Sequence, residues 1–190
     1  MRILTSLIAA VLAWCAPSAI AQTYPSKPIR LIVPWPPGGN VDITGRILSA
    51  SLTEQFGQTV IVDNRGGAGG TLGGNMVAKS APDGYTLLMG SSGSVTSGPA
   101  VYANMPYDPV RDFVAISMVH TVPMVVLASL KMPVANLRES IALAKERPGK
   151  VTMASGGTGG SSHLVVELLN AMAGVKFIHV PYKGSGPALL

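Results

Sequence analysis

The feature that most constrains this sequence is one local pattern that occurs twice: an apolar run, a glycine-rich loop, an amphipathic stretch and a closing glycine. In the first copy, the continuously apolar run 29–33 precedes the loop 34–39, and apolar residues recur at helical spacing from Asp42 to Phe56, before Gly57. A run without polar alternation is typical of a strand buried on both faces of a parallel sheet. The pattern therefore predicts α/β units.

The second copy has the same order of features. A strand is predicted over residues 150–154, the glycine loop follows at 155–160, and Ser161 opens a helix that ends at Gly174, before a strand over 177–180. Loops after parallel strands lie at the carboxyl edge of the sheet, where α/β proteins bind ligands. Two such units would place two helix N-termini across a cleft.

The remaining stretches complete two lobes. A strand, a helix and a strand are predicted over 59–62, 72–79 and 85–89, two further strands over 113–119 and 124–128, and a helix over 137–147. Residues 90–109 are rich in Ser, Gly and Pro, and a lobe boundary is predicted there. The expected organisation is a signal peptide (1–21), a first α/β lobe (22–105) and a second (106–190).

The N-terminus is predicted to be a cleavable export signal. Arg2 is followed by the apolar stretch 4–14 and the small-x-small site 19–21. This stretch is shorter than the roughly 20 residues that a bilayer requires, and Pro17 prevents its extension, so no stable membrane insertion is expected after cleavage. The single cysteine, Cys15, lies inside the signal, which leaves the exported chain without disulfides or a lipid anchor.

Composition favours a small anion over nucleic acid as the partner. The formal net charge is +5, yet the chain has three Phe and no cluster of Lys and Arg interleaved with aromatics. No loop contains G-x-G-x-x-G or a glycine followed by Lys-Ser or Lys-Thr, so no nucleotide cofactor is expected. Backbone N–H groups at glycine-rich helix starts do attract anions. For residues 66–74, tight turns alone explain the glycines equally well.

An exported serine hydrolase is the competing hypothesis from another class. No G-x-S-x-G elbow occurs, and the serines near Ser91 lack a readable histidine or acid partner. His163 and Glu167 are four residues apart and could share a metal, but no third ligand is apparent. His163 is instead expected to order the start of its helix, and His120 and His179 to be structural. We therefore predict no catalysis.

Several motifs in order resemble one known family, the Bug family of periplasmic receptors, which are the solute-binding proteins of tripartite tricarboxylate transporters. The matching segments cover essentially all of the chain after the signal. They are YPSKPIR (24–30), VPWPPGG (33–39) with Asp42, VDNRGGAGG (62–70), APDGYTLL (81–88), YDPVRDF (107–113), ASGGTGGSSHL (154–164) and HVPYKGS (179–185).

The resemblance implies a periplasmic binding protein-like fold, with two Rossmann-like lobes that close like a Venus flytrap on a di- or tricarboxylate or a similar acid. It further implies delivery to transporter membrane subunits, with no cofactor, metal or catalysis. The implied ligand-binding residues are Trp35, Pro36, Gly38, Gly39, Asn40, Ser91, Ser92, Ser155, Thr158, Gly159, Ser161, Ser162 and His163. Members of the family continue beyond the position of Leu190, so the second lobe and its return to the first are expected to be incomplete, and a truncated product without a ligand is a further alternative.

Overall fold

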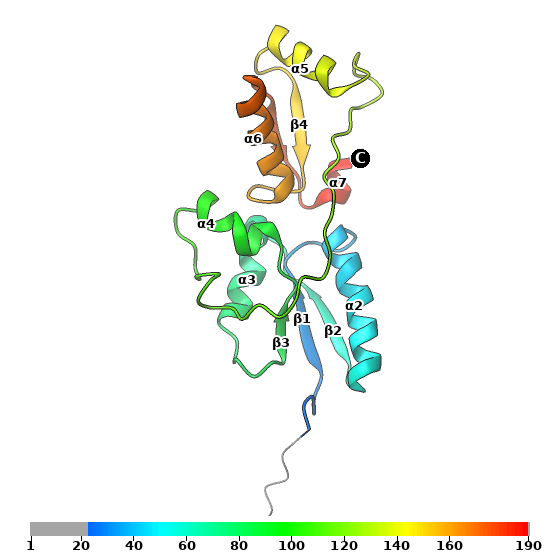
Figure 1. The fold of residues 1–190 in the computed structure, drawn as a ribbon, viewed down its shortest axis with the longest axis vertical. Helices are drawn as coiled ribbons and strands as arrows, with labels where there is room; N and C mark the ends of the chain where they lie inside the picture. The colour runs from blue at the N-terminus through cyan, green and yellow to red at the C-terminus, as the bar shows by residue number, and fades with distance from the viewer. Residues whose placement is uncertain (1–22, 190) are drawn as a thin grey trace, which may run out of the picture.

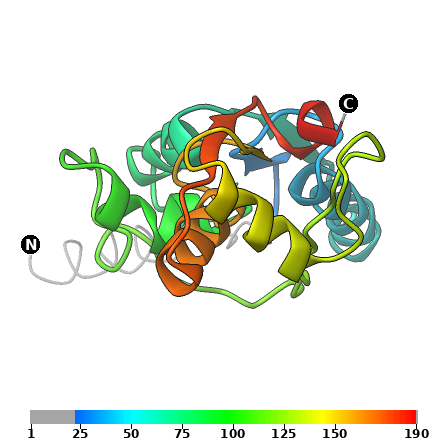
Figure 2. The ribbon, with the colours of Figure 1, turned by 90° about the horizontal axis from the view of Figure 1, so that it is seen from above.

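The computed structural model describes residues 23–189, which form two α/β parts stacked along the long axis of the molecule (Figure 1). We call the elements from β1 to α4 the first lobe and those from α5 to α7 the second lobe. Seen along the long axis, α2 and α4 lie on opposite sides of the view, with α5 and α6 between them in projection (Figure 2). The predicted signal peptide and its cleavage site lie outside the described residues.

The first lobe is built on a parallel sheet with the strand order β2-β1-β3, in which Leu31 of the central strand is paired with Val62 and Leu87. The two predicted helices and three predicted strands are present within one or two residues of their expected bounds. In chain order the elements are β1 (Ile29–Val33), α2 (Asn40–Phe56), β2 (Val60–Asn64), the 3₁₀ turn η1 (Ala68–Gly70), α3 (Thr71–Ala78), β3 (Thr86–Leu88), the π-helical turn η2 (Ser92–Thr96) and α4 (Gly98–Val101).

The core of the first lobe lies around β1, and it explains the unbroken apolar run. Ile29, Ile32 and Val33 are completely buried, because α2 covers one face of the sheet and α3 the other (Figure 1). Ile29, Leu31 and Val33 form one core cluster with Val60 and Met89. Gly57, directly after α2, has the left-handed conformation with φ of 64°, which a glycine adopts without strain.

The second lobe has a smaller sheet, in which β4 and β5 are parallel. Its core contains Ala144, Val151, Val166 and Phe177. The side chain of Asn136 accepts a hydrogen bond from the backbone N–H of Glu139 and so caps the start of α5. The elements are α5 (Leu137–Glu146), β4 (Thr152–Ser155), α6 (Ser161–Ala173), β5 (Ile178–Pro181) and α7 (Ser185–Leu189).

The two strands predicted over 113–119 and 124–128 are not formed, and this sequence-based prediction was wrong. Residues 113–129 instead run as an extended segment along the side of the molecule, from the first lobe to the second (Figure 1). Their apolar, β-branched composition favours strands, but a strand also needs a hydrogen-bonded neighbour, and none of the strands in residues 23–189 pairs with them. Val114 and Val125 are consequently 91% and 71% exposed.

The Ser-, Gly- and Pro-rich stretch 90–109 is more ordered than its composition indicates. It contains η2 and α4, and the hydroxyl of Tyr107 donates a hydrogen bond of 2.5 Å to the carbonyl of Ser94. Both residues are buried, so this stretch packs as part of the first lobe. None of the helices within residues 23–189 has the length and apolar character needed to cross a membrane.

Candidate functional site

The first glycine loop connects β1 to α2, and the buried carboxylate of Asp42 holds it in place. The backbone N–H of Gly38 and the side-chain amide of Asn64 each donate to Asp42 at 2.9 Å, and Arg46 binds the same carboxylate. Burial opposes ionisation of Asp42, but these hydrogen bonds and the positive charge of Arg46 outweigh it and hold its pKa below the ordinary value. Asp42 therefore acts as a charged anchor for the loop.

Trp35 joins this loop to two other segments. Its indole Nε1 donates to Ser91 Oγ at 2.9 Å, and its backbone carbonyl accepts from Asn64. The Trp35 ring also packs closely against Gly160 of the second lobe. A Cβ atom added at Gly160 would lie only 3.0 Å from the ring. Two residues predicted for the site, Trp35 and Ser91, are thus in direct contact.

In the second glycine loop, side chains from the first turn of α6 bind back onto the loop. Ser162 Oγ accepts from the N–H of Gly156 at 3.0 Å, and His163 Nδ1 accepts from the N–H of Gly159 at 3.2 Å. The predicted ordering role of His163 is therefore confirmed. The hydroxyl of Ser162 accepts in this contact, so its own proton is still available to a ligand, together with the backbone N–H groups of the first helical turn.

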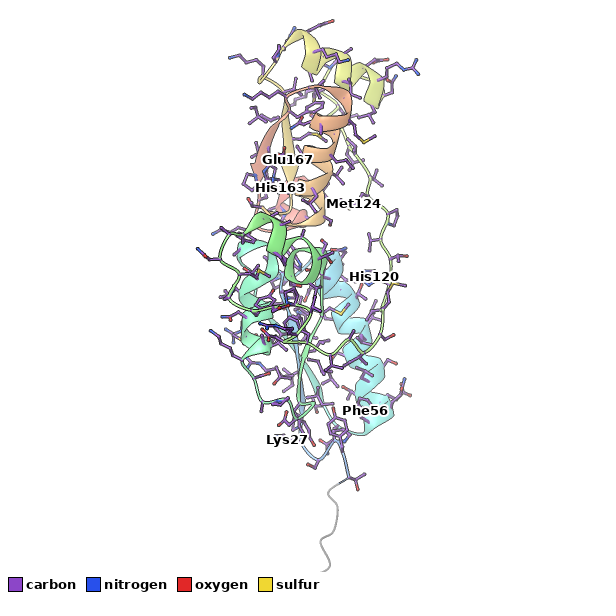
Figure 3. The ribbon with its side chains drawn as sticks, turned by 60° about the vertical axis from the view of Figure 1, so that its left-hand side comes forward. Lys27, Phe56, His120, Met124, His163 and Glu167 are labelled. Carbon is purple, nitrogen blue, oxygen red and sulfur yellow. The ribbon has the colours of Figure 1, made fainter. Side chains whose placement is uncertain are left out.

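Behind this loop lies a pair of imidazole rings in contact, tilted by 34° to each other. The rings of His163 and His179 are 4.1 Å apart, and His179 Nε2 is 2.5 Å from Ser155 Oγ. Glu167 Oε1 is 3.7 Å from His163 Nε2, and both residues lie on α6 near the junction of the lobes (Figure 3). Within residues 23–189 no group of three or more His, Cys, Asp or Glu residues could hold a metal ion.

The environment of His179 makes stability depend on pH in the weakly acidic range. Burial, and then the neighbouring His163, lower the pKa of His179, although Glu167 acts in the opposite direction. An unfolded histidine titrates near pH 6.5, so below that pH the unfolded chain binds more protons than the folded chain, and stability falls as the pH falls. We expect the melting temperature to decrease between about pH 7 and pH 5, above the range in which carboxylates titrate.

Melting curves of His179→Gln across the same pH range check this assignment. The variant should show a weaker dependence than the parent, whereas His120→Gln, which changes an exposed histidine on the extended segment, should leave the dependence unchanged. An equal pH dependence in the parent and in His179→Gln would contradict the assignment.

The two lobes contact each other through hydrogen bonds to the second glycine loop. Ser97 Oγ donates to the carbonyl of Gly159 at 2.6 Å, and the hydroxyl of Tyr102 donates to the carbonyl of Thr158 at 3.0 Å. Sequence reasoning missed Ser97 and Tyr102. Their position in a Ser- and Gly-rich stretch was visible, but nothing local indicates that their acceptors belong to the other lobe.

The thirteen residues predicted for the site fall into three groups. Ser155 is only 2% exposed and supports the loop from behind. A second group lies where the lobes meet. A third group lies at or near the two helix starts and is exposed or half-buried. The interlobe group contains Trp35, Pro36, Thr158 and Gly159, with Ser91 and Ser92 bonded to Trp35 and Ser97 on the first-lobe side, and the helix-start group contains Gly38, Gly39, Asn40, Ser161, Ser162 and His163.

Comparison with known proteins gives the relationship directly. Residues 44–190 match the tripartite tricarboxylate transporter family receptor. The chain belongs to this family. The resemblance seen in the motifs is thereby confirmed, and receptors of this kind bind solutes and are not enzymes.

One relative and two solved structures show how far the similarity extends. Protein BugT of Bordetella pertussis is 42% identical over 193 residues, which cover 98% of this chain and 59% of BugT. MatC from Rhodopseudomonas palustris, solved with bound malate, has a TM-score of 0.82 at 32% identity, and R. palustris Rpa4515 with adipate has 0.76 at 34%. Each alignment covers 87% of this chain and 56% of the solved chain. The chain therefore spans a little over half the length of these relatives, and the periplasmic binding protein-like fold is confirmed for the part that it spans.

Proposed function

We propose that this chain is the solute-capturing part of a periplasmic receptor, which binds a small di- or tricarboxylate between its lobes for transfer to membrane subunits of a tripartite transporter. Family membership supports the receptor role, and the malate bound to MatC and the adipate bound to Rpa4515 support the carboxylate class. The predicted export signal supports the location.

The observation that carries the ligand class is that two helix starts lie at the junction between the lobes. The first turns of α2 and α6 both lie at the junction of the lobes (Figure 1). A helix N-terminus offers unpaired N–H groups and the positive end of the helix dipole. Asp42 already binds Gly38 and Arg46 within the first lobe, and the hydroxyls around α6 are neutral donors. An anion with a carboxylate at each end can be bound without an arginine clamp.

The serine hydrolase alternative is not supported by the geometry. The hydroxyl of Ser91 contacts Trp35 and Ser94, and no imidazole is among its partners in the described chain. Ser155 does contact His179, but it is buried behind the loop, where a substrate carbonyl has no access. Within residues 23–189, the hydroxyl of the exposed Ser161 has no hydrogen bond to a histidine or an acid.

Thermal denaturation with a panel of acids tests the proposed function. Malate, adipate and citrate should be compared with the diamide of one dicarboxylate and with sodium chloride at matched ionic strength. The best acid, at about a hundred times its dissociation constant, should raise the free energy of unfolding by about 2.7 kcal/mol. The proposal is wrong if no acid at millimolar concentration stabilises the protein more than the neutral diamide and the salt do.

A further inference from the structure

We propose that Ser97 and Tyr102 are positioning residues, which hold the second glycine loop against the first lobe and stabilise the closed arrangement of the lobes before any solute is bound. The two residues directly follow η2 and α4, and their acceptors are the consecutive carbonyls of Gly159 and Thr158. The inference rests on the proposed function for its biological meaning. Its test needs no solute.

The two hydrogen bonds fix the orientation of two peptide planes. In a trans peptide the C=O and N–H groups point in opposite directions, so a plane bonded at both ends cannot rotate. The carbonyl of Thr158 is bound by Tyr102, and the N–H of the same peptide, on Gly159, is bound by His163. The next peptide is bound by Ser97 at the carbonyl of Gly159 and by Gly157 at the N–H of Gly160. The first lobe thus completes the ordering of the loop.

Ser97 can keep a hydrogen bond whether the lobes are closed or apart. Its Oγ lies 2.6 Å from the carbonyl of Gly159 and 3.0 Å from the carbonyl of Ser92, which belongs to its own lobe. A hydroxyl has one proton, so it can donate to only one of these carbonyls at a time. When the lobes separate, Ser97 can donate to Ser92 and the carbonyl of Gly159 can bind water. Because neither group is left buried without a partner, the interlobe bond is readily reversible.

Where the second glycine loop comes closest to the first lobe, the residues of the first lobe are glycines, so no side chain keeps the two backbones apart. A Cβ built on Gly69 would lie 2.4 Å from the carbonyl oxygen of Thr158, and a Cβ built on Gly93 would lie 3.3 Å from that of Gly159. Gly69 additionally has a φ of 64°, which favours glycine. The aromatic ring of Tyr102 lies against Gly159. The close approach of the two backbones is therefore built into the first lobe independently of the hydrogen bonds.

The test measures the distance between the lobes in the absence of solute. The chain after the predicted signal has no cysteine, so Ser51→Cys on α2 and Glu146→Cys on α5 provide two exposed labelling sites for spin labels or fluorophores. We expect the ratio of separated to closed molecules to rise about fivefold in Ser97→Ala and in Tyr102→Phe, and further in the double variant, because each substitution leaves a loop carbonyl without its donor only while the lobes are closed.

Matched controls remove hydrogen bonds of the same type within the first lobe. Ser80→Ala removes a bond from a serine hydroxyl to the carbonyl of Val77, and Tyr24→Phe removes one from a tyrosine hydroxyl to the carbonyl of Gly84. These controls should leave the interlobe distances unchanged even where they lower the melting temperature. An unchanged distance distribution in the double variant would overturn the inference.

A parallel titration with the best acid separates this inference from the proposed function. If distances shift in the double variant but no acid binds the parent, the positioning role stands and the proposed function fails. If acids bind the parent and the double variant equally well and the distances do not move, the proposed function stands and the positioning role fails. Tyr102→Phe keeps the shape of the side chain, so it reports on the hydrogen bond even if Ser97→Ala disturbs folding.

Discussion

Ser162→Asp is expected to abolish the stabilisation that an organic acid gives to this protein, while the fold is kept. Ser162 Oγ accepts a hydrogen bond from the N–H of Gly156, and an aspartate can accept the same bond. A carboxylate in the first turn of α6 also interacts favourably with the helix dipole, by about 0.3–1 kcal/mol. The same carboxylate would occupy the place of the ligand anion and repel it. Loss of one charge-assisted hydrogen bond alone weakens binding about ten- to hundredfold, so with repulsion we expect a loss of about a hundredfold or more.

Calorimetric titration and melting curves with the best acid measure this effect. Ser162→Ala should weaken binding less, because it removes a donor without adding a charge. Ser51→Asp adds the same charge on the exposed face of α2 and should bind the acid as the parent does. If Ser162→Asp kept an undiminished shift in melting temperature, the start of α6 would not be the anion site, and the residues assigned there would have to be withdrawn.

The second large effect concerns the extended segment 113–129, through which we expect a polypeptide of this sequence to self-associate. The segment exposes apolar side chains together with backbone groups that pair with no described strand. Such segments pair with other chains, and natural proteins protect them with charges. Val114→Lys combined with Val125→Lys should therefore convert oligomer or aggregate largely into monomer, as measured by size-exclusion chromatography with light scattering.

Two substitutions of equal charge outside the segment provide the control. Val110→Lys and Leu130→Lys change residues that are also highly exposed, but these residues lie outside the extended segment 113–129, one on each side. This control pair should leave most of the association in place. A sharp monomer peak for the unmodified polypeptide at micromolar concentration would show that the exposed segment does not drive association.

The fold was predictable where burial is continuous and where the ends of helices have their own chemistry. The unbroken apolar run of β1 reflects burial on both faces, and Gly57 and Gly174 mark helix ends because both have positive φ. Whether the strands expected within 113–129 would form could not be predicted from burial or helix-end signals. Strand propensity is a local property, whereas pairing depends on a neighbour that can lie anywhere else in the chain.

In the candidate site, too, the local features were predictable and the contacts between distant residues were not. The glycine loops and the role of His163 could be inferred because loop, helix start and side chain are adjacent in sequence. The anchoring by Asp42 depends on Asn64, which is distant in sequence, and the partners of Ser97 and Tyr102 belong to the other lobe. Contacts of this kind are set by tertiary packing, and no local pattern encodes them.

Residues 113–129 connect the two lobes, so closure is an association between two tethered parts of one chain. For a flexible tether, the effective concentration of one lobe at the other is on the order of millimolar. Two hydrogen bonds of about 0.5–1.5 kcal/mol each could not hold two separate proteins together. Between tethered lobes they are enough to bring the open and closed populations close to balance. A solute then has only a small free-energy difference to supply, and its concentration decides which state predominates.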